Sequence, residues 1–227
     1  EQYFLFEIII TLRKLGVSLK EIKHYISFRN ADNLRQLLLD KALECELQIE
    51  LLQRNCNNLR TNAARLARAK KIKRNQITLE YCEAEYFAAD PLSTGQRSMK
   101  ELIEQIARHN LPFAKSEIFN EYFMGYYITP DELCSAEDPA ISQVITRISH
   151  PDEYPKALCK PEGLYATIIA PDSYHTKYRD ALQALRDFIH HNGLQIVGAA
   201  YIIQLNNYWS TAEHKEYVTE ISIQVEN

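Results

Sequence analysis

The chain concentrates its tyrosines in the part that follows residue 80. Of its 14 tyrosines, only Tyr3 and Tyr25 come earlier. A tyrosine joins a flat apolar ring to a polar hydroxyl, and its ring face attracts cations, so several around one hollow can bind a flat or lipophilic ligand. Each ring taken alone is more often a core or surface residue, and only the cluster favours a hollow. We predict ligand contacts from Phe123, Tyr127, Tyr165, Tyr201, Tyr208 and Trp209.

Glu220 is the acidic side chain that we expect beside these rings. In the predicted last strand, residues 217–225, Ile221 and Ile223 alternate with Glu220 and therefore face the opposite side of the sheet. If Glu220 lines an aromatic hollow, its carboxylate is partly desolvated and requires a cationic partner, which a ligand could supply. If that face is open to water, Glu220 is an ordinary surface charge. The sequence leaves both interpretations open.

Motifs for catalysis, cofactors or metals are missing from the sequence. It has no GxSxG, P-loop, GxGxxG, HExxH or EF-hand pattern. The five cysteines include no CxxC pair, and an odd number is a poor disulfide framework, so we interpret them as reduced thiols. We predict no catalytic residue, no cofactor and no metal ligand. A metal or redox sensor that pairs Cys82 with a cysteine of a partner chain is an alternative.

Apolar residues recur at alternating spacings of four and three over residues 38–66, which predicts one long helix. This heptad repeat makes a narrow stripe that packs against a second helix, as in a coiled coil. We therefore predict that residues 31–74 form a dimerisation helix. An intramolecular hairpin is less favoured because only one helix of this length is predicted. The predicted interface comprises Leu38, Cys45, Ile49, Leu52, Cys56, Leu59 and Leu66.

Two short helices are predicted in residues 1–30. Gly16 ends the first, and Ser18 with Glu21 three residues later forms a capping box that begins the second, over residues 19–26. Asp32 or Asn33 can cap the long helix that follows. We interpret the cations at its end as solvated side chains that complement the helix dipole, with a nucleic-acid contact as the alternative. These cations are Arg68, Lys70, Lys71, Lys73 and Arg74.

From residue 75 onward the apolar period changes to two, which is typical of strands, so we predict that residues 75–227 form a separate domain. The expected strands are 77–87, 117–128, 157–160, 164–170, 195–205 and 217–225. The expected helices are 99–110 and 174–192. The fold class is α+β, and the order of elements predicts two similar α+β halves, which the family resemblance described below implies to be strand-helix-strand-strand units.

Composition limits the possible partners. The formal net charge of −4 argues against broad electrostatic adhesion to nucleic acid, although a local basic patch could still bind it. No apolar run approaches the roughly 20 residues that span a bilayer. The first residues lack the basic start of a signal peptide, so we expect a cytoplasmic protein without a membrane partner.

The N-terminal part resembles a known family. The run LGVSLKEI at residues 15–22, preceded by Tyr3, Phe4, Ile8 and Leu12 and followed by the heptad helix, is similar to MerR-family transcription regulators. It matches the second half of their DNA-binding domain and their dimerisation helix. The helix-turn-helix and wing that precede this segment in the family have no counterpart here. The resemblance therefore implies weak promoter binding by this chain, and no DNA-contacting residue is predicted.

The C-terminal domain, residues 75–227, resembles the gyrase-inhibitory-protein-like (GyrI-like) effector domain of multidrug-sensing MerR members. The matching residues are Gly163 to Ala166, the helix over 174–192, Gly193, Leu194, Gly198, Tyr201 and Tyr217 to Ile221. In that family a buried glutamate that neutralises cationic drugs often follows the tyrosine aligned with Tyr201. Here that position is Ile202. Glu220 is left to supply the charge, and a neutral lipophilic ligand is an alternative.

Together the resemblances imply a homodimeric transcription regulator that binds promoter DNA and a hydrophobic, drug-like effector. Family members act on RNA polymerase indirectly, by untwisting an overlong promoter spacer. The implied protein is not an enzyme. The alternative from a different class is a small-molecule hydrolase of the GyrI-like type, which would use the same aromatic hollow and one carboxylate to activate water.

Overall fold

The structure is a computed structural model that describes residues 2–71, 75–92, 99–115, 124–154, 156–171, 178–207 and 210–227. The chain divides into two compact units, Glu1–Arg54 and Asn55–Asn227. The division falls within the long helix α3 (Ala31–Lys71), so each unit contains part of it.

The first unit packs α1 (Gln2–Lys14) and α2 (Leu19–Ser27) against the start of α3 around a small core that includes Leu12 and Val17. Gly16 joins α1 to α2 with a positive φ of 79°, a conformation that glycine adopts without strain. The predicted capping box is confirmed, because Ser18 and Glu21 each bond to the other's backbone amide. Hydrogen bonds to the Glu21 carboxylate from the Ser18 side chain and from the Ser18 backbone amide, together with Lys41, lower the pKa of Glu21 to about 2. At the start of α3, the side chain of Asn30 accepts a bond from the Asn33 amide, so the prediction of Asp32 or Asn33 as its cap was wrong.

The described residues of the second unit form one antiparallel sheet of eight strands in the order β1-β6-β8-β7-β3-β4-β2-β5. The strands are β1 (Ile77–Cys82), β2 (Glu85–Pro91), β3 (Met124–Ile128), β4 (Gln143–Ile148), β5 (Ala157–Lys160), β6 (Gly163–Pro171), β7 (Gln195–Asn206) and β8 (Val218–Glu226). The helices are α4 (Met99–Lys115), α5 (Pro130–Ser135) and α6 (Tyr178–His191), with short 3-10 turns at Pro151–Glu153 and His214–Glu216.

The sheet consists of two equivalent halves, as predicted. Each half runs strand, helix, strand, strand: β2-α4-β3-β4 in one and β6-α6-β7-β8 in the other. In both halves the third strand lies between the first two, and the halves join where β3 pairs with β7. The strands β1 and β5 extend the two outer edges. The predicted α+β class is therefore confirmed.

Two details of the strand predictions were wrong. The expected strand over 77–87 is divided into β1 and β2, because the chain leaves the ladder at Glu83 and Ala84: β1 lies at one edge of the sheet, whereas β2 lies between β4 and the opposite edge strand, β5. Strand β4 and helix α5 were not predicted. The expected strand over 117–128 contains β3, and its residues 117–123 lie outside the described residues.

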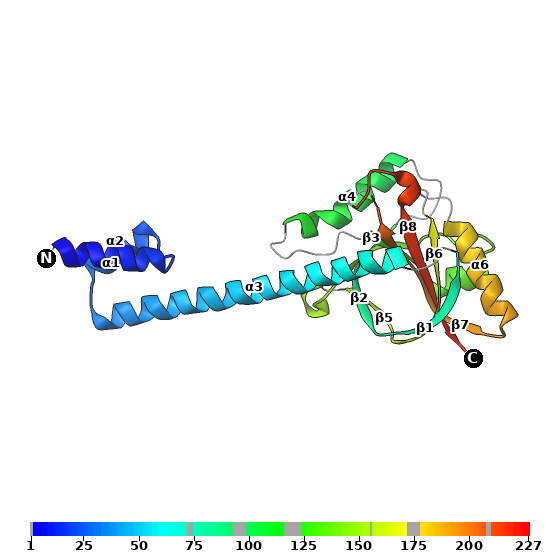
Figure 1. Cartoon of the computed structure of the whole chain (residues 1–227), viewed down its shortest axis with the longest axis horizontal. Helices are drawn as coiled ribbons and strands as arrows, with labels where there is room; N and C mark the ends of the chain where they lie inside the picture. The colour runs from blue at the N-terminus through cyan, green and yellow to red at the C-terminus, as the bar shows by residue number, and fades with distance from the viewer. Residues whose placement is uncertain are drawn as a thin grey trace. The chain divides into compact units, whose positions relative to one another are not determined.

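The two faces of the sheet have different roles. One face packs against α6 (Figure 1). Ile221 and Ile223 of β8 belong to the same buried hydrophobic cluster as Leu182 and Leu185 of α6. The alternation predicted for β8 is confirmed, since the side chain of Glu220 contributes to a cavity on the opposite face. The last turns of α3 lie over that second face and contribute side chains to the same cavity.

Candidate functional site

A cavity of about 270 Å³ opens on the second face of the sheet. Four cationic and four acidic side chains line it: Arg65 and Arg68 of α3, Arg147 of β4, Lys160 of β5, and Glu80, Glu83, Glu85 and Glu220. The remaining lining residues are Tyr81, Cys82, Ala84, Ile203 and Leu205. The charges therefore balance, and the cavity is more polar than the sequence predicted.

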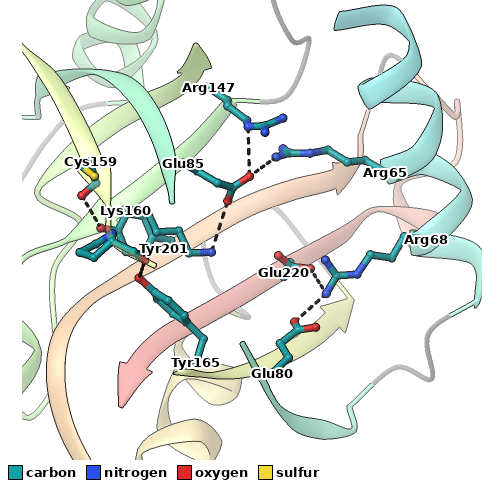
Figure 2. Close-up of polar contacts among 11 residues, drawn as sticks. Arg65, Arg68, Glu80, Glu85, Arg147, Cys159, Lys160, Tyr165, Tyr201 and Glu220 are labelled. Carbon is teal, nitrogen blue, oxygen red and sulfur yellow. Dashed lines mark hydrogen bonds and ion pairs between the residues drawn. The ribbon is translucent and has the colours of Figure 1, made fainter. Parts of the chain in front are cut away.

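Glu85 is the centre of one group of ion pairs (Figure 2). Its Oε1 lies 2.8 Å from Nη2 of Arg65 and 3.1 Å from Nε of Arg147, and its Oε2 lies 3.5 Å from Nζ of Lys160. Burial by itself raises the pKa of Glu85, but attraction to these three cations outweighs burial and lowers the pKa below its ordinary value. Glu85 is consequently a stable anion that holds the end of α3 to the sheet.

Lys160 lies over the predicted aromatic residues. Its Nζ is 4.6 Å from the ring centre of Tyr165 and 5.5 Å from that of Tyr201, which are cation–π distances. Tyr165 donates a hydrogen bond to the carbonyl of Pro161 at 2.7 Å, and burial raises the pKa of its hydroxyl. A lysine of the protein therefore already occupies the cation-attracting face of these rings.

Glu220 belongs to a second, looser group at the other end of the cavity (Figure 2). Nη2 of Arg68 lies 2.7 Å from Oε1 of Glu80 and 3.3 Å from Oε2 of Glu220. That Oε2 is buried and has no hydrogen-bond partner among the described residues. Burial raises the pKa of Glu220, and the attraction of Arg68 and Lys160 offsets this effect only in part. Glu220 is therefore a carboxylate whose need for a hydrogen-bond donor is not met.

The structure brings several of the predicted ligand contacts together. The rings of Tyr127 and Tyr165 lie 5.4 and 6.4 Å from that of Tyr201, on the same face as Glu220. Tyr165 and Tyr201 are buried, and the described lining of the cavity contains Glu220 but none of these three rings. The other predicted contacts, Phe123, Tyr208 and Trp209, lie outside the described residues. Ligand contact by all seven residues stays a prediction.

Most of the charged lining was not predicted from the sequence. The interpretation of Arg68 as a solvated helix-end cation was wrong, because it pairs with two carboxylates of the sheet. Arg147 and Lys160 lie in strands that are otherwise largely apolar. A charged residue inside such a strand is the signal that could have identified them. The placement of Arg65 and Arg68 had no comparable signal, since a helix surface normally carries cations.

A second polar cluster fixes α4 to the sheet. The buried ring of His109 lies 2.7 Å from Oδ2 of Asp90 through Nδ1 and 2.9 Å from Oγ1 of Thr146 through Nε2. An acid, imidazole and hydroxyl in this order resemble the arrangement that activates a nucleophile. Thr146 and His109 are both buried, however, so this cluster holds helix and sheet together rather than presenting a nucleophile to a substrate.

Within the described residues, no group of three or more His, Cys, Asp or Glu side chains could hold a metal ion. All five cysteines are free, and only Cys82 lines the cavity. Burial raises the pKa of the Cys82 thiol, which does not favour a reactive thiolate. Among the same residues, none of the helices has the length and apolar character needed to cross a membrane.

Comparison with known proteins gives one curated relative and several similar structures. The chain is 25% identical over 216 residues to the multidrug-efflux transporter 2 regulator of Bacillus subtilis (strain 168), covering 88% of this chain and 72% of that protein. A chain of the EcmrR–DNA complex, determined by cryo-EM in EcmrR-RPo, is similar over 98% of this chain and 82% of its own length, with a TM-score of 0.54 and 15% identity.

The crystal structure of the EcmrR C-terminal domain matches 67% of this chain and 98% of its own length, with a TM-score of 0.50 and 14% identity. At these identities the two structures establish similarity of fold. No family model matches the chain.

Proposed function

We propose that this chain is a ligand-responsive transcription regulator of the MerR type, with a GyrI-like effector domain in its second unit. The observation that carries the proposal is the position of the cavity, which the end of the long helix and the sheet build together. A compound that binds there contacts the side chains that α3 contributes to the lining. The cavity and the helix thereby link effector binding to the part of the chain that joins two subunits.

The Bacillus subtilis relative supports this function. Its name describes a regulator of a multidrug transporter, and its similarity extends over most of this chain. We infer a drug-like effector and a cytoplasmic location. Promoter DNA is bound through the N-terminal part, residues 1–30, and RNA polymerase is affected indirectly through the DNA.

The surface of α3 supports a homodimer. Leu38, Ile49, Leu52 and Leu59 are all exposed in the single chain, although they are large and apolar. A row of exposed leucine and isoleucine side chains at heptad spacing is stable in water when a second helix covers it. We therefore propose that α3 pairs with the same helix of a second subunit.

Glu220 is the residue through which we propose that the cavity selects its effector. The Glu220→Gln variant should bind a cationic dye at least ten-fold more weakly and its neutral analogue unchanged, because only the cation gains from the carboxylate. Fluorescence anisotropy titration of both dyes measures this difference. Glu226→Gln, an exposed carboxylate at the end of the same strand, is the control. Equal losses for both dyes would remove Glu220 from charge recognition.

Amide hydrogen exchange tests the regulatory link. Binding of the dye should change the exchange of residues 63–71 at the end of α3, because the arginines of this segment line the cavity. Unchanged exchange at saturating dye would contradict a signal through the helix.

Catalytic turnover separates the hydrolase alternative from the regulator. Sustained conversion of a bound compound that depends on Glu220 would favour the hydrolase.

A further inference from the structure

The four cations of the cavity are not held equally. Arg65, Arg147 and Lys160 converge on Glu85, and their side chains are 18%, 28% and 4% exposed. Arg68 has no part in that group and is 44% exposed. Its guanidinium reaches the other end of the cavity from the last turns of α3. Arg68 is therefore the cation that can leave the cavity most easily.

The partners of Arg68 define the chemistry of this end of the cavity. A single nitrogen, Nη2, lies between Oε1 of Glu80 at 2.7 Å and Oε2 of Glu220 at 3.3 Å. Two carboxylates around one N–H-bearing nitrogen suit a terminal guanidinium, an amidinium or a primary ammonium group, each of which offers several hydrogens. A quaternary ammonium group has the charge but no N–H donor, so Glu220 would remain without a hydrogen bond.

Arg68 satisfies Glu220 incompletely. Its distance to Oε2 of Glu220 is long for a charge-assisted hydrogen bond, and this buried oxygen has no hydrogen-bond partner among the described residues. A buried acceptor without a donor is destabilising. A freely moving ligand cation can approach closer than a side chain fixed to a helix. The position of Arg68 is therefore one that a ligand could fill better.

Because the charges in the cavity balance, we expect a ligand cation to replace one of the cationic side chains and not to enter in addition to them. The described lining carries four cationic side chains and four carboxylates. A further cation entering beside Arg65, Arg68 and Lys160 would leave an excess of positive charge in a partly buried space, which is unfavourable. The same cation gains the two carboxylates without this repulsion if Arg68 leaves.

We propose that Arg68 is an internal occupant of the effector site, and that the effector carries a terminal guanidinium, amidinium or primary ammonium group that replaces it between Glu80 and Glu220. This inference rests on the proposed function because it takes the cavity as the effector site. Replacement of Arg68 breaks the ion pairs that join the end of α3 to β1 and β8, while Arg65 still holds the helix to Glu85. Effector binding is thereby converted into a partial release of the long helix.

Chemical rescue of the Arg68→Ala variant tests the exchange. The probe is ethylguanidinium, titrated into the full chain by isothermal titration calorimetry. Removal of the competing side chain should strengthen binding of ethylguanidinium at least ten-fold relative to the parent chain. Tetramethylammonium, which lacks N–H donors, should show no such gain. The double variant Arg68→Ala/Glu220→Gln should lose the gain.

Arg179→Ala is the matched control. Arg179 is also half exposed and pairs with one carboxylate, Asp138, at 2.6 Å, but it lies outside the described lining of the cavity. Its variant should bind ethylguanidinium like the parent. Cooperative thermal unfolding establishes that each variant is folded, and Arg68→Met, which retains the apolar stem, replaces Arg68→Ala if the latter does not unfold cooperatively.

Two results would overturn the exchange. Equal affinity of Arg68→Ala and the parent for ethylguanidinium would show that Arg68 does not occupy the site. An equal gain for tetramethylammonium would show that charge alone is recognised. If either result is obtained while the affinity for the cationic dye still depends on Glu220, the proposed exchange is wrong and the proposed function is still supported. A gain specific to ethylguanidinium without any change in α3 exchange would support the exchange and contradict the regulatory link.

Discussion

Glu85 and Glu220 lie in one cavity but affect stability in opposite senses as the pH changes. Three cations hold the pKa of Glu85 below its ordinary value of 4.5 in spite of burial. Ionised Glu85 therefore stabilises the fold above pH 4.5, and this contribution is lost as the pH falls through the lowered pKa. Burial raises the pKa of Glu220 above 4.5. Its contribution is present below pH 4.5 and is lost as the pH rises through the raised pKa.

The Glu85→Gln variant should lose about 2 to 3 kcal/mol of stability at neutral pH, somewhat less than for a fully buried ion pair because 23% of the side chain is exposed. The loss should shrink as the pH falls from 4.5 through the lowered pKa, because the parent carboxylate then also becomes neutral. Urea unfolding between pH 7 and pH 3 measures it. Glu220→Gln is the internal comparison and should gain stability at neutral pH relative to pH 4. Parallel pH curves for the two variants would contradict these assignments.

At the level of elements, the junction of the two halves depends on close contact between β3 and β7. Gly125 pairs with Ile203 across this junction. A Cβ at residue 125 would lie 2.6 Å from Cδ1 of Ile203 and 2.7 Å from the backbone oxygen of Ile202. The side chain can move, whereas the backbone oxygen belongs to the paired strand. Glycine is required at residue 125 because the paired strand leaves no space for a Cβ atom.

Gly125→Ala should therefore destabilise the second unit by about 2 kcal/mol, within the range for overpacking a well-packed core. Chemical denaturation monitored by circular dichroism measures the change. Adding Ile203→Val removes Cδ1 and should restore only part of the loss, since the contact with Ile202 remains. Full restoration would mean that the side chain alone causes the strain.

The elements that the sequence predicted are those with a local signal. The Ser18–Glu21 capping box depends on residues three apart, and the alternation around Glu220 depends on neighbours in one strand. The division of the segment 77–87 has no such signal, because β1 lies at one edge of the sheet and β2 lies next to the opposite edge strand, β5. Their placement depends on pairing with the distant strands β6, β4 and β5.

The candidate site was also predictable only where the signal is local in the sequence. Glu220 and the grouping of Tyr127, Tyr165 and Tyr201 were predictable from strand alternation and composition. The cations opposite them were not, since they come from a helix and from two other strands that meet only in the folded sheet. For this reason the sequence predicted an aromatic hollow, whereas the described cavity is lined mainly by charged residues.

For the whole molecule, one face of α3 contacts the second unit, and a different face carries the apolar heptad stripe. Asn58 accepts a hydrogen bond from Ser149, and Arg65 pairs with Glu85, so this stripe holds the second unit. Leu52 and Leu59 belong to the heptad stripe and are exposed. A helix that fixes its own domain with polar residues and leaves an apolar stripe uncovered has a surface available for a second subunit.

Leu52→Asp should therefore weaken dimerisation by several kcal/mol, because pairing would bury an unpaired carboxylate in the stripe. Leu52 is 66% exposed in the single chain, so the same change should have little effect on the folding of a monomer. Sedimentation velocity over a range of concentrations measures the shift from dimer to monomer. Ile103→Asp, at a residue of α4 that is 58% exposed and lies outside the heptad repeat, should leave the parent's state unchanged. If the Leu52→Asp variant sediments as a dimer like the parent chain, the subunits pair through another surface. If the parent chain is monomeric at every concentration, the heptad stripe does not pair at all.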